Sequence, residues 1–168
     1  PVAGSTGVLI PPQGYLKLID LGLCKELGDA DRSHTVCGTP IYMSPERFST
    51  CDQGHGLPSD WWALGVMLFE LVFSATPHAM AGAAGDDEEL LRKILDPDFV
   101  PQLLDDVAGY PGVSPASTAL MAGLMAFDPS ARPDACSVRQ HAFFEGQDWD
   151  ALLEQRLPPL VEPGAGDD

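Results

Sequence analysis

The sequence contains the segment Gly38-Thr39-Pro40-Ile41-Tyr42-Met43-Ser44-Pro45-Glu46, followed after a short interval by Asp60-Trp61-Trp62-Ala63-Leu64-Gly65-Val66. Apolar residues continue to about residue 73 on nearly every side of a helical wheel, and a helix of this kind belongs in the centre of a fold. Ser59 and Asp60 are residue types that cap helices. The pattern therefore predicts a central helix over residues 61–73, entered from a loop.

Shorter elements flank this helix on both sides. Residues 15–19 alternate well enough for a short strand, and the apolar residues 8–10 are its natural partner. Residues 24–58 are interrupted by Gly, Pro, Ser and Asp, which predicts a long ordered loop. Further helices are expected over residues 86–95, 115–127 and 135–141, and an amphipathic turn over residues 149–153. We expect a mainly α fold with a small β hairpin at its N-terminal end.

Composition narrows the class of protein. The 168 residues are enough for one domain, and 45% hydrophobic with 20% charged residues suits a globular core. Lys and Arg number 9 against 25 Asp and Glu, so the formal charge is -16. This balance argues against nucleic acid and anionic membranes as partners, because both need a basic surface. It leaves room for basic partners, including Arg- or Lys-bearing peptides.

Membrane, secretory and metal classes find no support in the sequence. No apolar run reaches the roughly 20 residues of a membrane span, and the N-terminal residues lack the basic region of a signal peptide. Cys24, Cys37, Cys51 and Cys136 are scattered, without zinc-ligand spacing. We expect free thiols and a cytoplasmic protein.

Asp20-Leu21-Gly22 places a carboxylate at the end of the expected strand, beside a Gly that lets the backbone turn. Mg²⁺ prefers hard oxygen ligands, commonly one or two carboxylates with substrate phosphates. By itself, however, Asp-x-Gly is also a common turn signal. A simple turn is therefore the alternative at this position.

Taken in order, these motifs resemble the C-terminal half of a protein kinase domain, most closely the AGC serine/threonine group near its cyclic-nucleotide-dependent members. The series continues with Asp128-Pro129-Ser130-Ala131-Arg132 and His141-Ala142-Phe143-Phe144. The resemblance implies a kinase-like C-terminal lobe without the N-terminal lobe. It divides the chain into an unmatched segment 1–7, a partial kinase domain 8–157 and an acidic, Pro- and Gly-containing tail 158–168.

The resemblance implies a phosphate-handling end of the lobe. Asp20 matches the Asp that binds Mg²⁺ against the phosphates of ATP. Leu21 stands where Phe is usual. Thr35 matches the activation-loop phosphorylation site, a target for an activating kinase, and Lys25 matches one partner of that phosphate. An exposed Thr without a role is the alternative for Thr35.

The resemblance also implies a substrate-binding segment. Thr39 matches the Thr that contacts the catalytic loop. Val36, Pro40 and Met43 match the pocket for the residue after the phosphoacceptor. Glu70 matches the acid that binds an Arg upstream of the phosphoacceptor, with an ordinary solvated helix Glu as the alternative.

Structural roles follow from the resemblance as well. Glu46 and Arg132 match a buried carboxylate–guanidinium pair that ties the activation segment to the helices. Asp60 matches the Asp that anchors the catalytic loop through backbone amides, with a simple helix cap as the alternative. Ile41 and Pro133 depart from the usual residues of close relatives.

The resemblance to protein kinases ends before residue 8, where the catalytic-loop motif is missing. Alignment on residues 8–10 puts Pro1, Val2 and Gly7 at the catalytic-loop Arg, the catalytic-base Asp and the metal-binding Asn, so no catalytic residue is assigned. We expect a fragment of a serine/threonine kinase that transfers the ATP γ-phosphate to Ser or Thr in basic peptides, inactive as given. The alternative is a non-catalytic kinase-lobe module that binds substrates or regulators.

Overall fold

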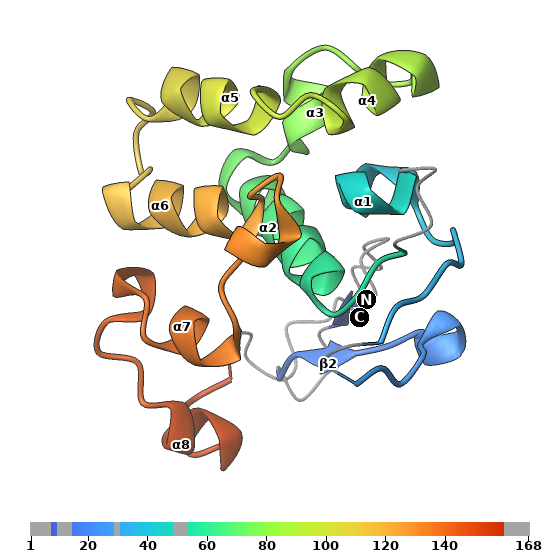
Figure 1. Ribbon diagram of the computed structural model, residues 1–168. Coiled ribbons are helices and arrows are strands. Elements are labelled where there is room, and N and C mark those ends of the chain that lie inside the picture. The colour runs from blue at the N-terminus through green and yellow to red at the C-terminus, as the bar shows by residue number, and fades with distance from the viewer. Residues whose placement is uncertain (1–7, 10–14, 29–30, 49–53, 160–168) are drawn as a thin grey trace, which may run out of the picture. The chain divides into compact units, whose positions relative to one another are not determined.

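The computed structural model describes residues 8–9, 15–28, 31–48 and 54–159 (Figure 1). The chain divides into two compact units. The first comprises residues 1–25 and 146–168, and the second comprises residues 26–145. The fold is mainly α-helical with one small antiparallel strand pair, as the sequence predicts.

The first unit contains the strand pair and the last helix. Strands β1 (Val8–Leu9) and β2 (Lys17–Leu18) are antiparallel, with Val8 opposite Leu18. The 3₁₀ turn η1 (Leu21–Leu23) follows, and α8 (Trp149–Leu153) begins after Asp148, whose carboxylate accepts a hydrogen bond from the Ala151 N–H at 2.8 Å. The Tyr15 hydroxyl donates toward the carbonyl oxygens of Gln155 and Leu157, each at 3.2 Å.

The second unit contains the helical body (Figure 1). In chain order its elements are η2 (Pro40–Tyr42), α1 (Pro45–Phe48), α2 (Pro58–Phe73), α3 (Pro77–Met80), α4 (Asp87–Ile94), α5 (Phe99–Val107), α6 (Pro115–Leu124), η3 (Pro129–Ala131), α7 (Ala135–Arg139) and η4 (Ala142–Phe144).

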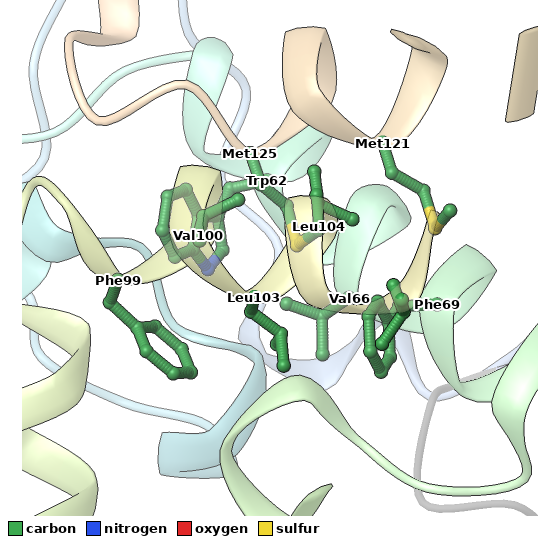
Figure 2. Packing of buried hydrophobic residues seen from close by; sticks show 10 residues of the cluster. Trp62, Val66, Phe69, Phe99, Val100, Leu103, Leu104, Met121 and Met125 are labelled. Atoms are coloured by element: carbon green, nitrogen blue, oxygen red, sulfur yellow. The ribbon is translucent and has the colours of Figure 1, made fainter. Parts of the chain in front are cut away.

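The main core forms around α2, as its apolar sequence predicts. Trp62, Val66 and Phe69 recur at three- and four-residue spacing, so they share one helix face. Figure 2 shows these side chains packed against residues of α5 and of the α6 region. The complete cluster of buried residues consists of Trp62, Val66, Phe69, Phe99, Val100, Leu103, Leu104, Val107, Met121 and Met125.

Gly65 lets α2 approach the end of α6 closely. A Cβ placed at Gly65 would lie 2.6 Å from the Cγ of Met125 and 2.9 Å from the Cβ of Leu124, distances that side-chain carbons do not tolerate. The packing of these two helices therefore depends on the absence of a side chain at this position.

Several predicted boundaries need correction. The α2 helix begins at Pro58, with Leu57 at the N-cap position, so Asp60 lies inside the first turn and does not cap the helix. Proline suits the first helical position because its missing N–H would have no partner there. The 115–127 helix ends at Leu124, and the 135–141 helix ends at Arg139.

The loop predicted over residues 24–58 contains two short turns of helix, η2 and α1. Helix α5 has no counterpart among the predicted helices, because Pro101 interrupts its apolar pattern. Its buried side chains nevertheless lie on one face, namely Phe99, Val100, Leu103, Leu104 and Val107. The segment 1–7, most of the tail 158–168, Ile10 and Cys51 lie outside the described residues.

Candidate functional site

The segment 38–46 crosses the second unit in a defined conformation. Gly38 has a φ of 108°, a region that side-chain-bearing residues rarely adopt. Pro40–Tyr42 then form the single turn η2, and Met43 is buried with 6% of its surface exposed. The segment is therefore anchored through Met43, whereas Thr39 and Pro40 are exposed.

Glu46 at the end of this segment is held by Arg132. Arg132 donates from Nη1 to Oε1 of Glu46 at 2.7 Å and from Nη2 to Oε2 at 2.9 Å. The Ser59 hydroxyl donates to the same Oε1 at 2.8 Å. The structure thus brings together a two-pronged ion pair between residues far apart in the sequence.

Every N–H of the Arg132 guanidinium has an acceptor. Beyond Glu46, Nη1 donates to the Pro58 carbonyl at 3.0 Å, Nη2 to the Phe127 carbonyl at 3.3 Å and Nε to the Ala126 carbonyl at 2.8 Å. The guanidinium carbon also lies 5.2 Å from the centre of the Trp62 ring. A guanidinium has five N–H donors, so this buried charge is fully hydrogen-bonded.

The ion pair also lowers the pKa of the Glu46 carboxyl. Burial alone would raise the pKa of this carboxyl, but the hydrogen bond and the positive charge of Arg132 outweigh burial, and the Ser59 hydroxyl adds to them. The pKa of Glu46 is therefore below its ordinary value, and the carboxylate stays ionised at neutral pH.

A second contact joins the 38–46 segment to α2. The Tyr42 hydroxyl donates to Oε2 of Glu70 at 2.6 Å. A bond of this length from a neutral hydroxyl to an ionised carboxylate is of the strong, charge-assisted kind. Glu70 is partly exposed on the last turns of α2, so its carboxylate faces both Tyr42 and solvent.

Residues 34–36, before Gly38, form an exposed strap that follows the buried Ser33, and Ser33 pairs with His55. Ser33 and His55 exchange backbone hydrogen bonds of 2.8 Å in both directions. Thr35 and Val36 are exposed, and Val36 has 62% of its surface in solvent. The next residue, Cys37, is fixed by Arg47, whose Nη2 donates to the Cys37 carbonyl at 2.7 Å.

Asp20 belongs to the first unit, directly before η1. Its backbone is left-handed, with φ 60° and ψ 55°, and its side chain is exposed. Asp is one of the few residues with a side chain that adopts this region with any frequency, and such outliers often mark functional sites. Lys25 is also exposed and lies in the same unit.

Asp60 lies on an open hollow beside the start of α2. The hollow measures about 620 Å³ and is lined by Leu57, Pro58, Asp60, Trp61, Leu64, Arg132, Pro133, Asp134 and Ala135. The lining is largely apolar, and Asp60 and Asp134 are its only acidic members in the described part of the chain. The Asp60 carboxylate can therefore accept hydrogen bonds from a group that enters the hollow.

The described residues contain no cluster of three or more His, Cys, Asp and Glu side chains that could enclose a metal ion. No described helix combines the length and apolar character needed to span a bilayer. Cys24, Cys37 and Cys136 are free thiols.

Two contributors to the site were missed from the sequence. Tyr42 engages Glu70, and Ser59 engages Glu46. For Tyr42 a signal was available, because a half-buried hydroxyl in an apolar segment needs a hydrogen-bond partner. Ser59 is of a residue type that caps helices, but α2 begins at Pro58 without a side-chain cap, and the Ser59 hydroxyl donates to Glu46 at 2.8 Å instead.

Comparison with known proteins gives consistent matches. Residues 5–144 match the family described as protein kinase domain. The chain is 35% identical over 165 residues to ribosomal protein S6 kinase alpha-4 of Homo sapiens, covering 93% of this chain and 20% of that protein.

Two further relatives are serine/threonine-protein kinase N2 of Danio rerio and protein kinase C zeta type of Oryctolagus cuniculus. The first is 35% identical over 162 residues, covering 92% of this chain and 15% of that protein. The second is 33% identical over 172 residues, covering 96% and 27%. The chain thus spans between about a seventh and a quarter of the length of these relatives.

Proposed function

Because this chain belongs to the protein kinase domain family, within its AGC serine/threonine group, we propose that it supplies the peptide-binding helical lobe of a serine/threonine kinase. The intact enzyme transfers the γ-phosphate of ATP to Ser or Thr in a basic peptide. The observation that carries this proposal is the 2.6 Å contact between Tyr42 and Glu70, which joins the 38–46 segment to an acid suited to binding Arg.

Substrate binding is proposed to use the exposed side of the 38–46 segment. Val36 and Pro40 offer exposed apolar surface, and the buried Met43 anchors the same stretch of chain. Tyr42 occupies Oε2 of Glu70, and Oε1 receives no hydrogen bond within the described residues. A substrate guanidinium can therefore bind Oε1, in a charge-assisted contact worth about 1.5–3 kcal/mol. Thr39 contacts the catalytic loop in this proposal.

Asp20 is proposed as the residue that binds Mg²⁺ of the ATP complex. One exposed carboxylate fits Mg²⁺ only as part of a shared set, because this ion commonly binds one or two carboxylates together with phosphate oxygens. Gly22 has no side chain, and a Cβ added there would lie 3.7 Å from Oδ1 of Asp20. The carboxylate therefore stays accessible on this side. When bound, the ion neutralises charge on the transferred phosphate.

Two further assignments belong to this proposal. Thr35 is the site of an activating phosphate, because it is exposed on a strap that ends beside the 38–46 segment. Asp60 anchors the catalytic loop from the hollow that it lines. The partial kinase domain 8–157 and a cytoplasmic location remain predictions from the sequence.

We also propose that this chain does not transfer phosphate by itself. Val2 and Gly7 cannot accept a proton or bind a metal ion, yet they align with the residues that do so in kinases. Incubation with MgATP and an Arg-containing Ser peptide is therefore expected to give no phosphopeptide by mass spectrometry. Turnover that survives repurification of the protein would refute this part of the proposal.

Binding of a basic peptide tests the proposal directly. A labelled Ser peptide with Arg upstream of the Ser should bind the chain in a fluorescence anisotropy titration. Glu70→Gln should weaken this binding about tenfold, which corresponds to the lower end of the charge-assisted range. Glu88→Gln changes the net charge equally on the exposed first turn of α4 and should leave binding unchanged. Equal affinities for both variants, or no binding by the wild type, would refute the proposed role of Glu70.

A further inference from the structure

Helices α5 and α6 contact each other in the second unit (Figure 1), and their side chains leave an apolar groove between them. Its volume is about 510 Å³, within the range of roughly 300–1,000 Å³ that is usual for ligand sites. The residues that line it are Pro97, Val100, Pro101, Leu104, Asp105, Ala108, Pro115, Thr118, Ala119, Ala122, Met125, Ala126 and Phe127.

The groove has a fixed floor and an open rim. Val100, Leu104 and Met125 belong to the buried core, so the floor cannot collapse without disrupting that core. Ala119 and Ala122 on α6 are exposed and small, which keeps the mouth open. Phe127 is 39% exposed at the rim, an unusual place for a large aromatic side chain.

Arg132 fixes the end of the groove. Its guanidinium donates to the carbonyl oxygens of Ala126 and Phe127, at 2.8 and 3.3 Å. The backbone of these two residues is therefore held in place in the free protein. A preformed groove loses little conformational entropy on binding, which favours affinity.

The charges that line the groove indicate which kind of ligand it can bind. Asp105 is the single charged residue among the lining residues, and no Lys or Arg lines the groove in the part of the chain that the structure describes. Asp96 and Asp98 are exposed on either side of the lining residue Pro97. An apolar floor with carboxylates at its edge complements apolar side chains that are followed by a basic one.

We propose that this groove binds an apolar segment of a partner protein flanked by Lys or Arg. A fatty acid is disfavoured because its carboxylate would meet Asp105 without a basic counterpart. A second copy of the chain is disfavoured because each copy carries a charge of -16. The groove uses none of the residues to which the proposed kinase function assigns a role, so the two proposals can fail separately.

Peptide selection on the whole chain tests the proposal. Random peptides displayed on phage are selected on the wild-type protein, and the enriched sequences are synthesised and titrated by fluorescence anisotropy. Apolar residues flanked by Lys or Arg are the expected outcome. Enrichment of apolar peptides without basic residues, or no enrichment, would overturn the proposal.

Variants then locate the bound peptide. Ala122→Phe fills the groove from an exposed helix position and should weaken binding at least tenfold. Ala119→Phe serves the same purpose if circular dichroism shows Ala122→Phe to be unfolded. Binding that survives in the folded variant would overturn the proposal, as would competition by a fatty acid or a dimer that the variant dissociates.

A matched charge pair separates the groove from the general acidity of the protein. Asp105 and Asp106 are neighbours on α5 and both are exposed, but only Asp105 lines the groove. Asp105→Lys should weaken binding of the basic peptide at least fivefold, whereas Asp106→Lys should change it less than twofold. Equal effects would show that the peptide responds to net charge alone, which overturns the proposal.

Discussion

Arg132 connects distant parts of the second unit through its hydrogen bonds. It binds Glu46 of the 38–46 segment, the first turn of α2 through Pro58, and the chain beyond α6 through Ala126 and Phe127. Lys could not replace it, because an ammonium has three donors in another geometry. One side chain therefore organises three separate stretches of sequence.

Loss of Arg132 should destabilise the fold severely. Arg132→Ala leaves the Glu46 carboxylate buried without its partner, a change that costs about 3–5 kcal/mol. Urea unfolding followed by circular dichroism measures this loss. Arg132→Lys should fall between the wild type and Arg132→Ala, and it provides a measurable variant if Arg132→Ala does not fold.

Arg92→Ala is the control for this comparison. Arg92 pairs with Glu89 on the surface of α4, and exposed pairs contribute about 0–1 kcal/mol. If Arg92→Ala and Arg132→Ala destabilised the protein equally, the guanidinium of Arg132 would not have the structural role described.

His78 is a buried histidine whose environment lowers its pKa. It is 1% exposed, and neither ring nitrogen has a hydrogen-bond partner within the described residues. Its ring stacks on Phe99 with a centroid distance of 5.4 Å. Burial, with a smaller contribution from the charge of Lys93, lowers the pKa of His78 to about 4. The buried ring is therefore neutral at pH 7.

The pH dependence of the free energy of unfolding should reveal the protonation of His78. Between pH 6.5 and 4 the unfolded chain binds a proton at His78 and the folded chain does not, so stability falls as the pH falls, by about 3 kcal/mol in all. Urea midpoints measured from pH 7.5 to 4.5 report it. His78→Leu should flatten this part of the profile, and a variant profile parallel to that of the wild type would refute the assignment.

At the level of elements, α2 and α6 pack through Gly65. Local helix propensity would favour Ala at this position by about 1 kcal/mol. The close contact between α2 and the end of α6 outweighs the helix propensity of Ala, because a Cβ at Gly65 would overlap Met125 and Leu124. The glycine belongs to the packing of two helices and cannot be explained from α2 alone.

Two substitutions of Gly by Ala should have opposite effects. Gly65→Ala forces the helices apart and should destabilise the protein by about 1–3 kcal/mol. Gly123→Ala, on α6, would place its Cβ an ordinary 3.8 Å from Pro133 and should stabilise by about 0.5–1 kcal/mol. Thermal unfolding of both variants measures the difference, and a stabilised Gly65→Ala would contradict the close approach of α2 and α6.

The elements differ in how far sequence predicts them. The apolar run of α2 and the acidic start of α4 are strong local signals, and both helices form over the predicted stretches, although α2 begins three residues earlier, at Pro58. In α5 the presence of Pro101 suggests a break, yet proline is tolerated within a first turn. The burial of Phe99 and Leu103 against α2 then stabilises the helix, and this contribution cannot be read from residues 99–107 alone.

At the level of the whole molecule, the net charge of -16 is the main electrostatic property of the protein. Like charges repel in the compact state, and this repulsion is screened as the Debye length falls to about 8 Å at physiological ionic strength. The exposed pairs of α4 lose little when salt is added, because such pairs are weak.

Added salt should therefore stabilise the protein. Raising NaCl from about 10 mM to about 150 mM shortens the Debye length from roughly 30 to 8 Å. A gain of about 1 kcal/mol would raise the thermal midpoint by about 2–4 °C for a chain of this size. Differential scanning fluorimetry measures this midpoint. A midpoint that falls with salt would show that attractive surface pairs outweigh the net repulsion.

The amino-acid sequence alone specifies the family, the net charge and the position of the central helix, because each depends on residue identity or on local periodicity. The partners of Arg132, the contact of Tyr42 with Glu70 and the groove beside α5 emerge only when distant segments pack together. Glu46 and Arg132 are separated by 86 residues. Local patterns carry no information about such distances, and closure of the core sets them.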